Sequence, residues 1–277
     1  MNVRMKSFIL GVALLAQTQM SAAQTTSVAQ IPEAAKAAKT QKLHILFNLE
    51  TSSNMYREDS VDREASTDFL LNPSYQLTDR YSLAAKSMIS KEETGARNTT
   101  VSNTSISLKM KGIEIGKNAS LSHSLTGILP TNEEARKTDR FQGAVAIGNG
   151  IGFRFLNVDS KYVITVQKNV HEFTVNADDS PNVEYSLKHD LSFDIELTPK
   201  LSLSPSGYYR TGWTYHNFTR NSYGLGLDLN FEAAKDFVIY VGSGNEGAAY
   251  KANGTESNIK AFDQNTSVLR AGLSYTY

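Results

Sequence analysis

The sequence predicts an all-β protein folded as a transmembrane, antiparallel, up-and-down β-barrel of about twelve strands. Three observations lead to this fold class. Apolar and polar residues alternate along most of the chain, which is the period of a strand with one apolar and one polar face. Short and long connections between these strands alternate. Aromatic residues gather at the two ends of the strands, with aliphatic residues between them, as at the two interfaces of a membrane.

The segment Val183–Pro199 shows the alternation most clearly. Its odd positions are apolar apart from His189, and its even positions carry five charges and no apolar residue. A soluble β-sandwich would turn the apolar face toward a second sheet, whereas a membrane barrel turns it toward lipid. Because nearly every strand carries so polar a second face, we expect the apolar faces to meet lipid and the polar faces to line a lumen.

Each expected strand is justified by its own set of alternating apolar residues. In the strand at 162–175 the apolar residues change parity, so we expect a β-bulge near residues 167–171. Short connections are expected at 78–80, 111–116, 157–160, 198–200 and 232–236, and longer ones at 55–67, 91–97, 131–138, 177–182, 216–221 and 246–263. An even strand number places both termini on the short-turn rim. The twelve strands are expected at 45–49, 69–77, 81–89, 106–110, 119–129, 141–155, 162–175, 183–197, 201–215, 223–231, 237–241 and 269–277.

Composition excludes several classes of protein. The chain has 277 residues, with 28 basic and 28 acidic side chains, no cysteine and a mean hydropathy of −0.34. Zero net charge gives no electrostatic case for nucleic acid as a partner. Without cysteine there are no disulfides and no thiolate metal sites. Beyond the N-terminus, no segment approaches the roughly 20 apolar residues of a membrane-spanning helix.

The N-terminus predicts export. Arg4 and Lys6 precede an apolar run at 8–16, and small residues follow at 21–23, which is the order of a secretory signal peptide. The alternative is a membrane-anchor helix, for which the apolar run is too short. We therefore expect a signal peptide at 1–23, a periplasmic leader at 24–41 that is flexible or forms a short helix, and an outer-membrane barrel at 42–277.

The last eight residues resemble the C-terminal assembly signal of bacterial outer-membrane β-barrel proteins of the porin-like class. In that signal a polar residue is followed two positions later by glycine, and apolar or aromatic residues stand third and fifth after the glycine. Arg270, Gly272, Tyr275 and Tyr277 fill these positions, although phenylalanine usually stands where Tyr277 does. The resemblance implies folding by the barrel assembly machinery and surroundings of outer-membrane lipid and lipopolysaccharide.

The polar faces predict the lining of the lumen. Twelve strands lie between the filled eight-stranded barrels and the open sixteen-stranded channels, so we expect a narrow passage. The charged residues on these faces either pair with one another as structural salt bridges or form a constriction with a transverse field. Small inward residues at 144–152, with Gly224, Gly226 and Gly272, either leave open space or ease curvature. The expected pore-lining residues are Glu50, Lys86, Arg140, Arg154, Glu184, Lys188, Asp190, Arg210, Asp228 and Arg270.

Enzymatic function is not expected. No histidine is followed two positions later by serine, the arrangement of the outer-membrane phospholipase family, and no histidine pair has metal-ligand spacing. We expect no catalytic residue, no metal and no cofactor. The sequence therefore predicts a narrow porin-like channel for small hydrophilic solutes. The alternative is a non-conducting barrel that serves as a structural or surface anchor and binds a partner through its extracellular loops.

Overall fold

The computed structural model describes residues 42–56, 60, 62–264 and 266–277. The expected signal peptide and periplasmic leader lie outside the described residues, so both remain predictions. The described strands are β1 Leu43–Asn54, β2 Ala65–Gln76, β3 Tyr81–Glu92, β4 Thr99–Val101, β5 Thr104–Glu114, β6 Ala119–Leu129, β7 Phe141–Phe155, β8 Val158–His171, β9 Val183–Thr198, β10 Leu201–Thr214, β11 Thr219–Ala234, β12 Phe237–Ala248 and β13 Val268–Thr276, with one described helix, α2 Glu133–Lys137.

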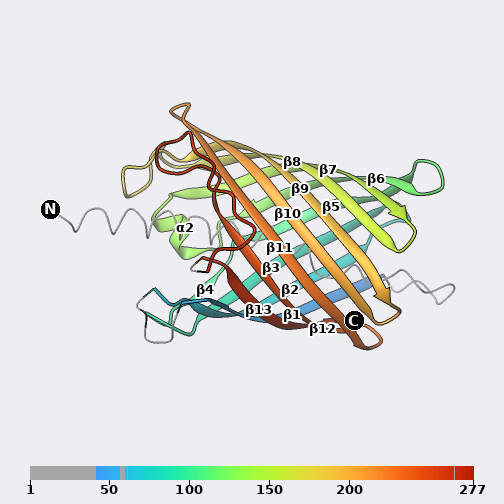
Figure 1. Cartoon of the computed structure of the whole chain (residues 1–277). Coiled ribbons are helices and arrows are strands. Elements are labelled where there is room, and N and C mark those ends of the chain that lie inside the picture. Colours follow the sequence, from blue (N-terminus) through green and yellow to red (C-terminus); the bar gives the residue numbers. More distant parts are fainter. Residues whose placement is uncertain (1–41, 57–59, 61, 265) are drawn as a thin grey trace.

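The strands form one closed antiparallel barrel (Figure 1). Apart from the short β4, each strand pairs with the strands before and after it, so that β3 pairs with β2 and β5, and β1 pairs with β13 to close the ring. The three-residue β4 pairs with β3 beside the start of β5. The other twelve strands make the wall, so the predicted fold class is confirmed.

The two rims differ as the connections predict. Turns of two to four residues join the strands at the rim where the chain ends, and the longer loops and α2 lie at the opposite rim (Figure 1). The start of β1 and the C-terminal residue meet at the short-turn rim, where the Ile45 amide donates to the Tyr277 carbonyl (3.1 Å) and the Tyr277 amide donates to the Ile45 carbonyl (2.9 Å).

The outer face of the wall is apolar. In β11, for example, Leu227 is 45% exposed and Phe231 is 46% exposed, whereas Asp228 and Asn230 on the inner face are 2% and 5% exposed. This inversion of the usual soluble pattern is typical of a barrel whose outer wall meets lipid. His189 is the one polar residue on the apolar face of its strand. Its Nδ1 atom shares a hydrogen bond with the Tyr162 hydroxyl (2.7 Å) on the outer wall.

Several strand boundaries differ from the prediction, and β1, for example, continues to Asn54 while β2 begins at Ala65. β8 ends at His171, its register with β9 is continuous, and Phe173 lies beyond the strand. The prediction of a bulge in this strand is wrong. The register shift occurs instead in the neighbouring β7, between Phe141 and Gly143. β12 continues to Ala248, past the end expected at residue 241, because its glycine-rich part stays paired with β11.

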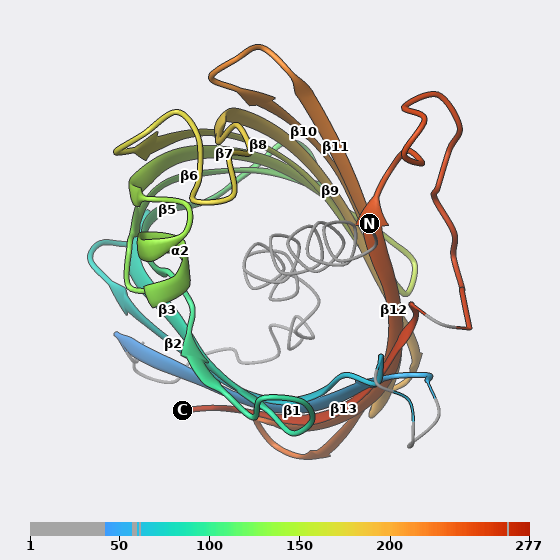
Figure 2. The same ribbon diagram turned by 90° about the vertical axis from the view of Figure 1, so that its left-hand side faces the viewer.

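The connection between β6 and β7 is partly helical, which the sequence analysis did not predict. The Asn132 side chain caps α2 by accepting from the Ala135 amide (2.7 Å). Ala135 packs with Phe141 and Ala144 in a small buried cluster, and α2 lies inside the ring of strands (Figure 2). Phe141, an aromatic residue at the start of its strand, therefore belongs to this inner cluster and not to an outer aromatic girdle. None of the described helical residues forms a helix with the length and hydropathy to span a membrane.

Candidate functional site: the barrel lumen

Strand alternation places most of the predicted pore-lining residues on the inner face. In β3 the inward Ala84 is 4% exposed and the outward Leu83 is 42% exposed, and Lys86 shares the face of Ala84. A role of these residues in conduction remains a prediction. The predicted residues on the inner face are Glu50, Lys86, Arg154, Lys188, Asp190, Arg210, Asp228 and Arg270.

Two predicted residues lie elsewhere. Arg140 stands in the connection between α2 and β7, exposed and with a φ of 55°. Glu184 lies near a register shift between β9 and β10, and its carboxylate pairs with Lys168. The Lys168 ammonium lies 4.0 Å from the ring centre of the outward-facing Tyr185. Glu184 therefore belongs to the outer rim rather than to the pore lining.

One side of the lumen is filled by a buried ion pair. Arg270 Nε and Nη2 donate to the two carboxylate oxygens of Asp228, each at 2.8 Å. The two side chains are 8% and 3% exposed. The pair crosses over β12, where Gly242 lies directly beneath the Asp228 carboxylate. A bidentate pair so closely enclosed fixes the wall of the barrel, so these charges fit the structural interpretation rather than a constriction.

A second network adjoins this pair. The Tyr240 hydroxyl donates to Glu50 Oε2 (2.8 Å), and Asn48 Nδ2 donates to the same hydroxyl (3.0 Å). A Cβ added at Gly272 would overlap the Tyr240 hydroxyl, so this glycine gives the tyrosine its room. Tyr275 and Tyr277 of the predicted assembly signal are 42% and 59% exposed, and their role in assembly remains a prediction.

A third network lines β9, β10 and β12. The Lys188 ammonium lies 2.6 Å from Asp190 Oδ1 and 4.6 Å from the ring centre of Tyr208. The Tyr208 hydroxyl donates to Glu246 Oε2 (3.3 Å). Arg210 Nη2 donates to the Ser186 hydroxyl (3.2 Å). The acids on this side of the lumen are therefore engaged by neighbouring side chains.

On the opposite side of the lumen, β6 and β7 carry mainly small inward side chains. Small residues face one another across the two strands, and Cβ atoms added at Gly148 and Gly150 would come within 2.6 Å of the Ser124 and Ser122 hydroxyls. These glycines therefore leave room for the serine side chains, in addition to any role in the curvature of the barrel. We call this the small-residue wall, and it consists of Ser120, Ser122, Ser124, Thr126, Ala144, Ala146, Gly148, Gly150 and Gly152.

Lys109 and Lys161 are inward residues that the sequence analysis missed. Lys109 of β5 pairs in register with Ser124, and Lys161 of β8 pairs with Gly152. The signal was present in the sequence, because Lys109 alternates with the outward Leu108 and Lys161 precedes the outward Tyr162. The lysines therefore stand at the two edges of the small-residue wall.

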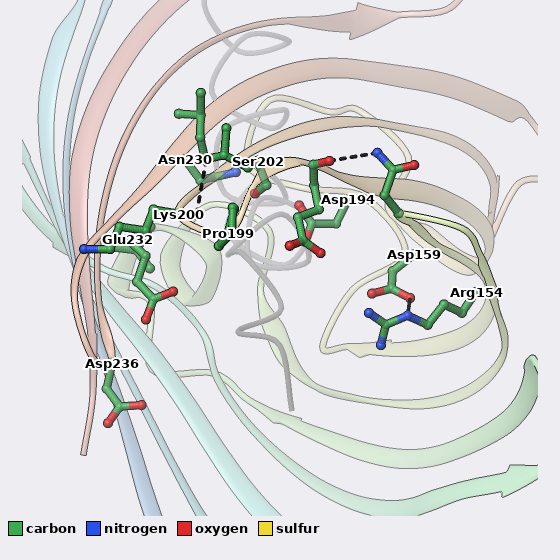
Figure 3. A pocket seen from close by; sticks show the side chains of 14 residues that line it. Arg154, Asp159, Asp194, Pro199, Lys200, Ser202, Asn230, Glu232 and Asp236 are labelled. Carbon is green, nitrogen blue, oxygen red and sulfur yellow. Dashed lines mark hydrogen bonds and ion pairs between the residues drawn. The ribbon is translucent and has the colours of Figure 1, made fainter. Parts of the chain in front are cut away.

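The short-turn mouth of the barrel contains a pocket rich in carboxylates (Figure 3). The Arg154 guanidinium lies 3.5 Å from Asp159, and Asn157 Nδ2 donates to the Glu196 carbonyl (2.8 Å). The charged residues that line this pocket are Arg154, Asp159, Asp194, Glu196, Lys200, Glu232 and Asp236. Carboxylates outnumber cations in this lining, so the mouth differs in charge from the lysine-bearing middle of the lumen.

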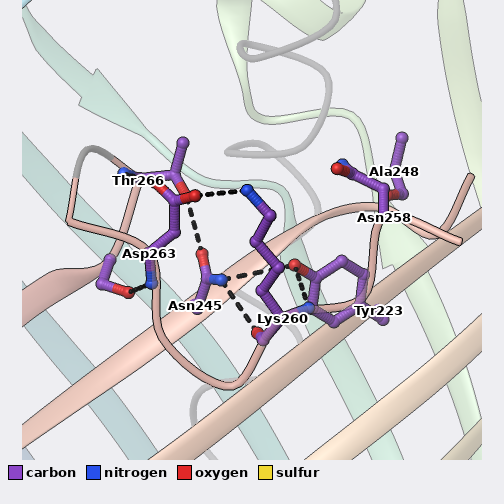
Figure 4. Close-up of polar contacts among 8 residues, drawn as sticks. Tyr223, Asn245, Ala248, Asn258, Lys260, Asp263 and Thr266 are labelled. Atoms are coloured by element: carbon purple, nitrogen blue, oxygen red, sulfur yellow. Dashed lines mark hydrogen bonds and ion pairs between the residues drawn. The ribbon is translucent and has the colours of Figure 1, made fainter. Parts of the chain in front are cut away.

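The longest loop, residues 249–267, folds against the outside of the wall (Figure 2). The Tyr223 hydroxyl accepts from the Lys260 amide (3.1 Å), and Asn245 Nδ2 donates to the Lys260 carbonyl (2.9 Å) (Figure 4). Thr266 Oγ1 donates to Asn245 Oδ1 (3.0 Å). Tyr223 has the strand parity of the outward Leu225 and Leu227, yet it is 4% exposed because this loop covers it.

The structure offers no site for a metal within the part of the chain that it describes, since no three His, Asp or Glu side chains there converge to hold an ion. No known family model matches the chain, and no curated protein is similar to it in sequence. The fold, however, is shared with solved structures of bacterial outer-membrane channels and porins.

Three of these structures illustrate the likeness. An outer membrane channel from Pseudomonas putida F1 has a TM-score of 0.60 at 12% identity, covering 89% of this chain and 99% of that one. The NanC porin has a TM-score of 0.55 at 8% identity, with coverages of 83% and 98%. A KdgM porin solved in complex with disordered oligogalacturonate has a TM-score of 0.50 at 10% identity, with coverages of 84% and 99%. The chain thus has the fold of a bacterial outer-membrane β-barrel, in agreement with the predicted location.

Proposed function

We propose that this protein is a non-enzymatic channel through which small hydrophilic solutes diffuse across the outer membrane. The observation that carries the proposal is the small-residue wall. Bulky side chains of Tyr208, Tyr240 and Arg270 occupy the lumen opposite it, whereas β6 and β7 present hydroxyl groups and bare backbone. A polar surface without bulky side chains is what a diffusing, hydrated solute requires.

Narrowing this passage tests the proposal. In planar bilayers, the refolded wild-type protein is expected to give stepwise conductance. Ser124→Trp places an indole on the small-residue wall, and we expect it to reduce single-channel conductance by about half or more, since conductance follows pore diameter. Leu125→Trp is the matched control, because the neighbouring side chain is 50% exposed on the outer wall, and it is expected to conduct like the wild type.

Two outcomes would contradict the proposal. Equal conductance of the Ser124→Trp and Leu125→Trp variants would remove β6 and β7 from the solute path. A wild-type barrel that folds but carries no current would favour the non-conducting anchor, whose partner would meet the extracellular loops. Ile259 and Phe262 on the longest loop are 46% and 57% exposed, and they are the residues at which such a partner is best sought.

A further inference from the structure

The small-residue wall is flanked on both sides by lysines. In the order of strands around the barrel, β3 and β5 precede β6 and β7, and β8 and β9 follow them. Lys86 and Lys109 stand on the first side, and Lys161 and Lys188 on the second. Residues paired in register across the wall run from Lys109 through Ser124, Gly148 and Thr165 to Lys188, so these two lysines lie at the same level on its two sides. Four strands thus carry inward lysines beside the small-residue wall.

Three carboxylates of the lumen are engaged by other side chains. Asp228 is occupied by both donor nitrogens of Arg270, Glu50 accepts from Tyr240, and Asp190 is already 2.6 Å from Lys188. Within the described part of the chain, Lys109 and Lys161 form no salt bridge. In the proposed channel these two inward charges would raise the local concentration of anions in the passage.

We propose that the small-residue wall and its flanking lysines form a binding track for small hydrophilic anions, with multiply charged carboxylates held most strongly. An ammonium group is a compact, hydrated point charge that does not impose the planar geometry of an arginine fork. It therefore selects charge rather than shape. The serine hydroxyls between the lysines supply further hydrogen-bond donors to a carboxylate. This inference rests on the proposed channel function and names its class of solute.

Ion selectivity tests the track directly. With a KCl gradient across a planar bilayer, the wild type is expected to favour chloride over potassium. The double variant Lys109→Gln/Lys161→Gln should lower the chloride-to-potassium permeability ratio by about threefold or more, since fixed charges set selectivity in a narrow pore. Lys251→Gln removes the same charge from the outer loop, where Lys251 pairs with Glu256, and should leave the ratio unchanged. Lys109→Arg/Lys161→Arg should retain the wild-type ratio.

Citrate is the second probe, because it separates failure of the track from failure of the channel. Added to the wild-type channel, citrate should block the chloride current, and the double glutamine variant should need at least about tenfold more citrate for the same block. If the wild type carries no current, titration calorimetry of citrate into the detergent-solubilised barrel still decides the matter. Cation selectivity of the wild type, or equal citrate affinity of the wild type and the double glutamine variant, would overturn the inference.

Discussion

At the scale of single residues, burial decides which lumen charges are structural. Arg270 and Asp228 are enclosed by neighbouring strands and bond through two parallel contacts. Lys109 and Lys161 stand at the edge of the open wall and form no comparable pair within the described chain. Charged side chains of the lumen therefore fall into two groups. Paired charges fix the wall, and under the proposal the lysines beside the small-residue wall act on the solution.

Removing one member of the buried pair should destabilise the barrel. Arg270→Met leaves the Asp228 carboxylate uncompensated at 2% exposure, and we expect a loss of about 3–5 kcal/mol in the free energy of unfolding. Urea unfolding in lipid vesicles measures it. The double variant Arg270→Met/Asp228→Asn should recover part of the loss, because no unpaired charge remains at position 228. A single variant as stable as the wild type would show that the pair does not support the wall.

At the scale of strands, glycines on the inner face are matched to aromatic rings on their neighbours. Gly224 of β11 pairs in register with Tyr208 of β10, and the three atoms nearest to a Cβ added at Gly224 all belong to the Tyr208 ring. The ring therefore lies flat over the neighbouring strand, where its hydroxyl reaches Glu246 of β12. The glycine in one strand thus determines the side-chain position of the next.

Gly224→Ala should therefore cost about 1–3 kcal/mol of unfolding free energy, the typical penalty for overpacking a close contact. Gly247→Ala in β12 is the control, since nothing lies within 4 Å of a Cβ added there, and it should leave stability nearly unchanged. Both are measured by urea unfolding. If the two variants lose equal stability, or if Tyr208→Ser fails to relieve the cost in the Gly224→Ala background, the ring does not determine the effect.

Strand existence and orientation could be predicted from the sequence, because alternation reports directly which face each residue occupies. Strand ends could not be predicted as well. The glycine-rich stretch after Val241 has the composition of a loop, yet it extends β12 because Asp228 and Arg270 require a wall without Cβ atoms beneath them. Glu246 was therefore missed as an inward residue. The burial of Tyr223 under the longest loop could not be predicted either. The contact joins residues far apart in the chain, so it leaves no local pattern in the sequence.

At the scale of the whole molecule, the barrel separates two environments. The outer wall presents aliphatic side chains such as Leu125 and Leu227, and the lumen presents serines, glycines and charges. Backbone groups are paired around the closed ring, so the wall can lie in hydrocarbon without unsatisfied polar groups. The proposed channel function and the proposed anion preference both depend on this separation of a lipid-facing wall from a polar interior.

The measurement that tests this separation most directly is the accessibility of spin labels along β6. The chain has no cysteine, so single substitutions can be labelled without background. In lipid vesicles, a label at Leu125→Cys should collide mainly with oxygen dissolved in the bilayer, and a label at Ser124→Cys should collide mainly with a water-soluble nickel chelate. Repeating the pair at Leu108 and Lys109 of β5, on the outer and inner faces, should give the same alternation. Contact of the leucine positions with the nickel chelate instead of oxygen would contradict a lipid-facing apolar wall.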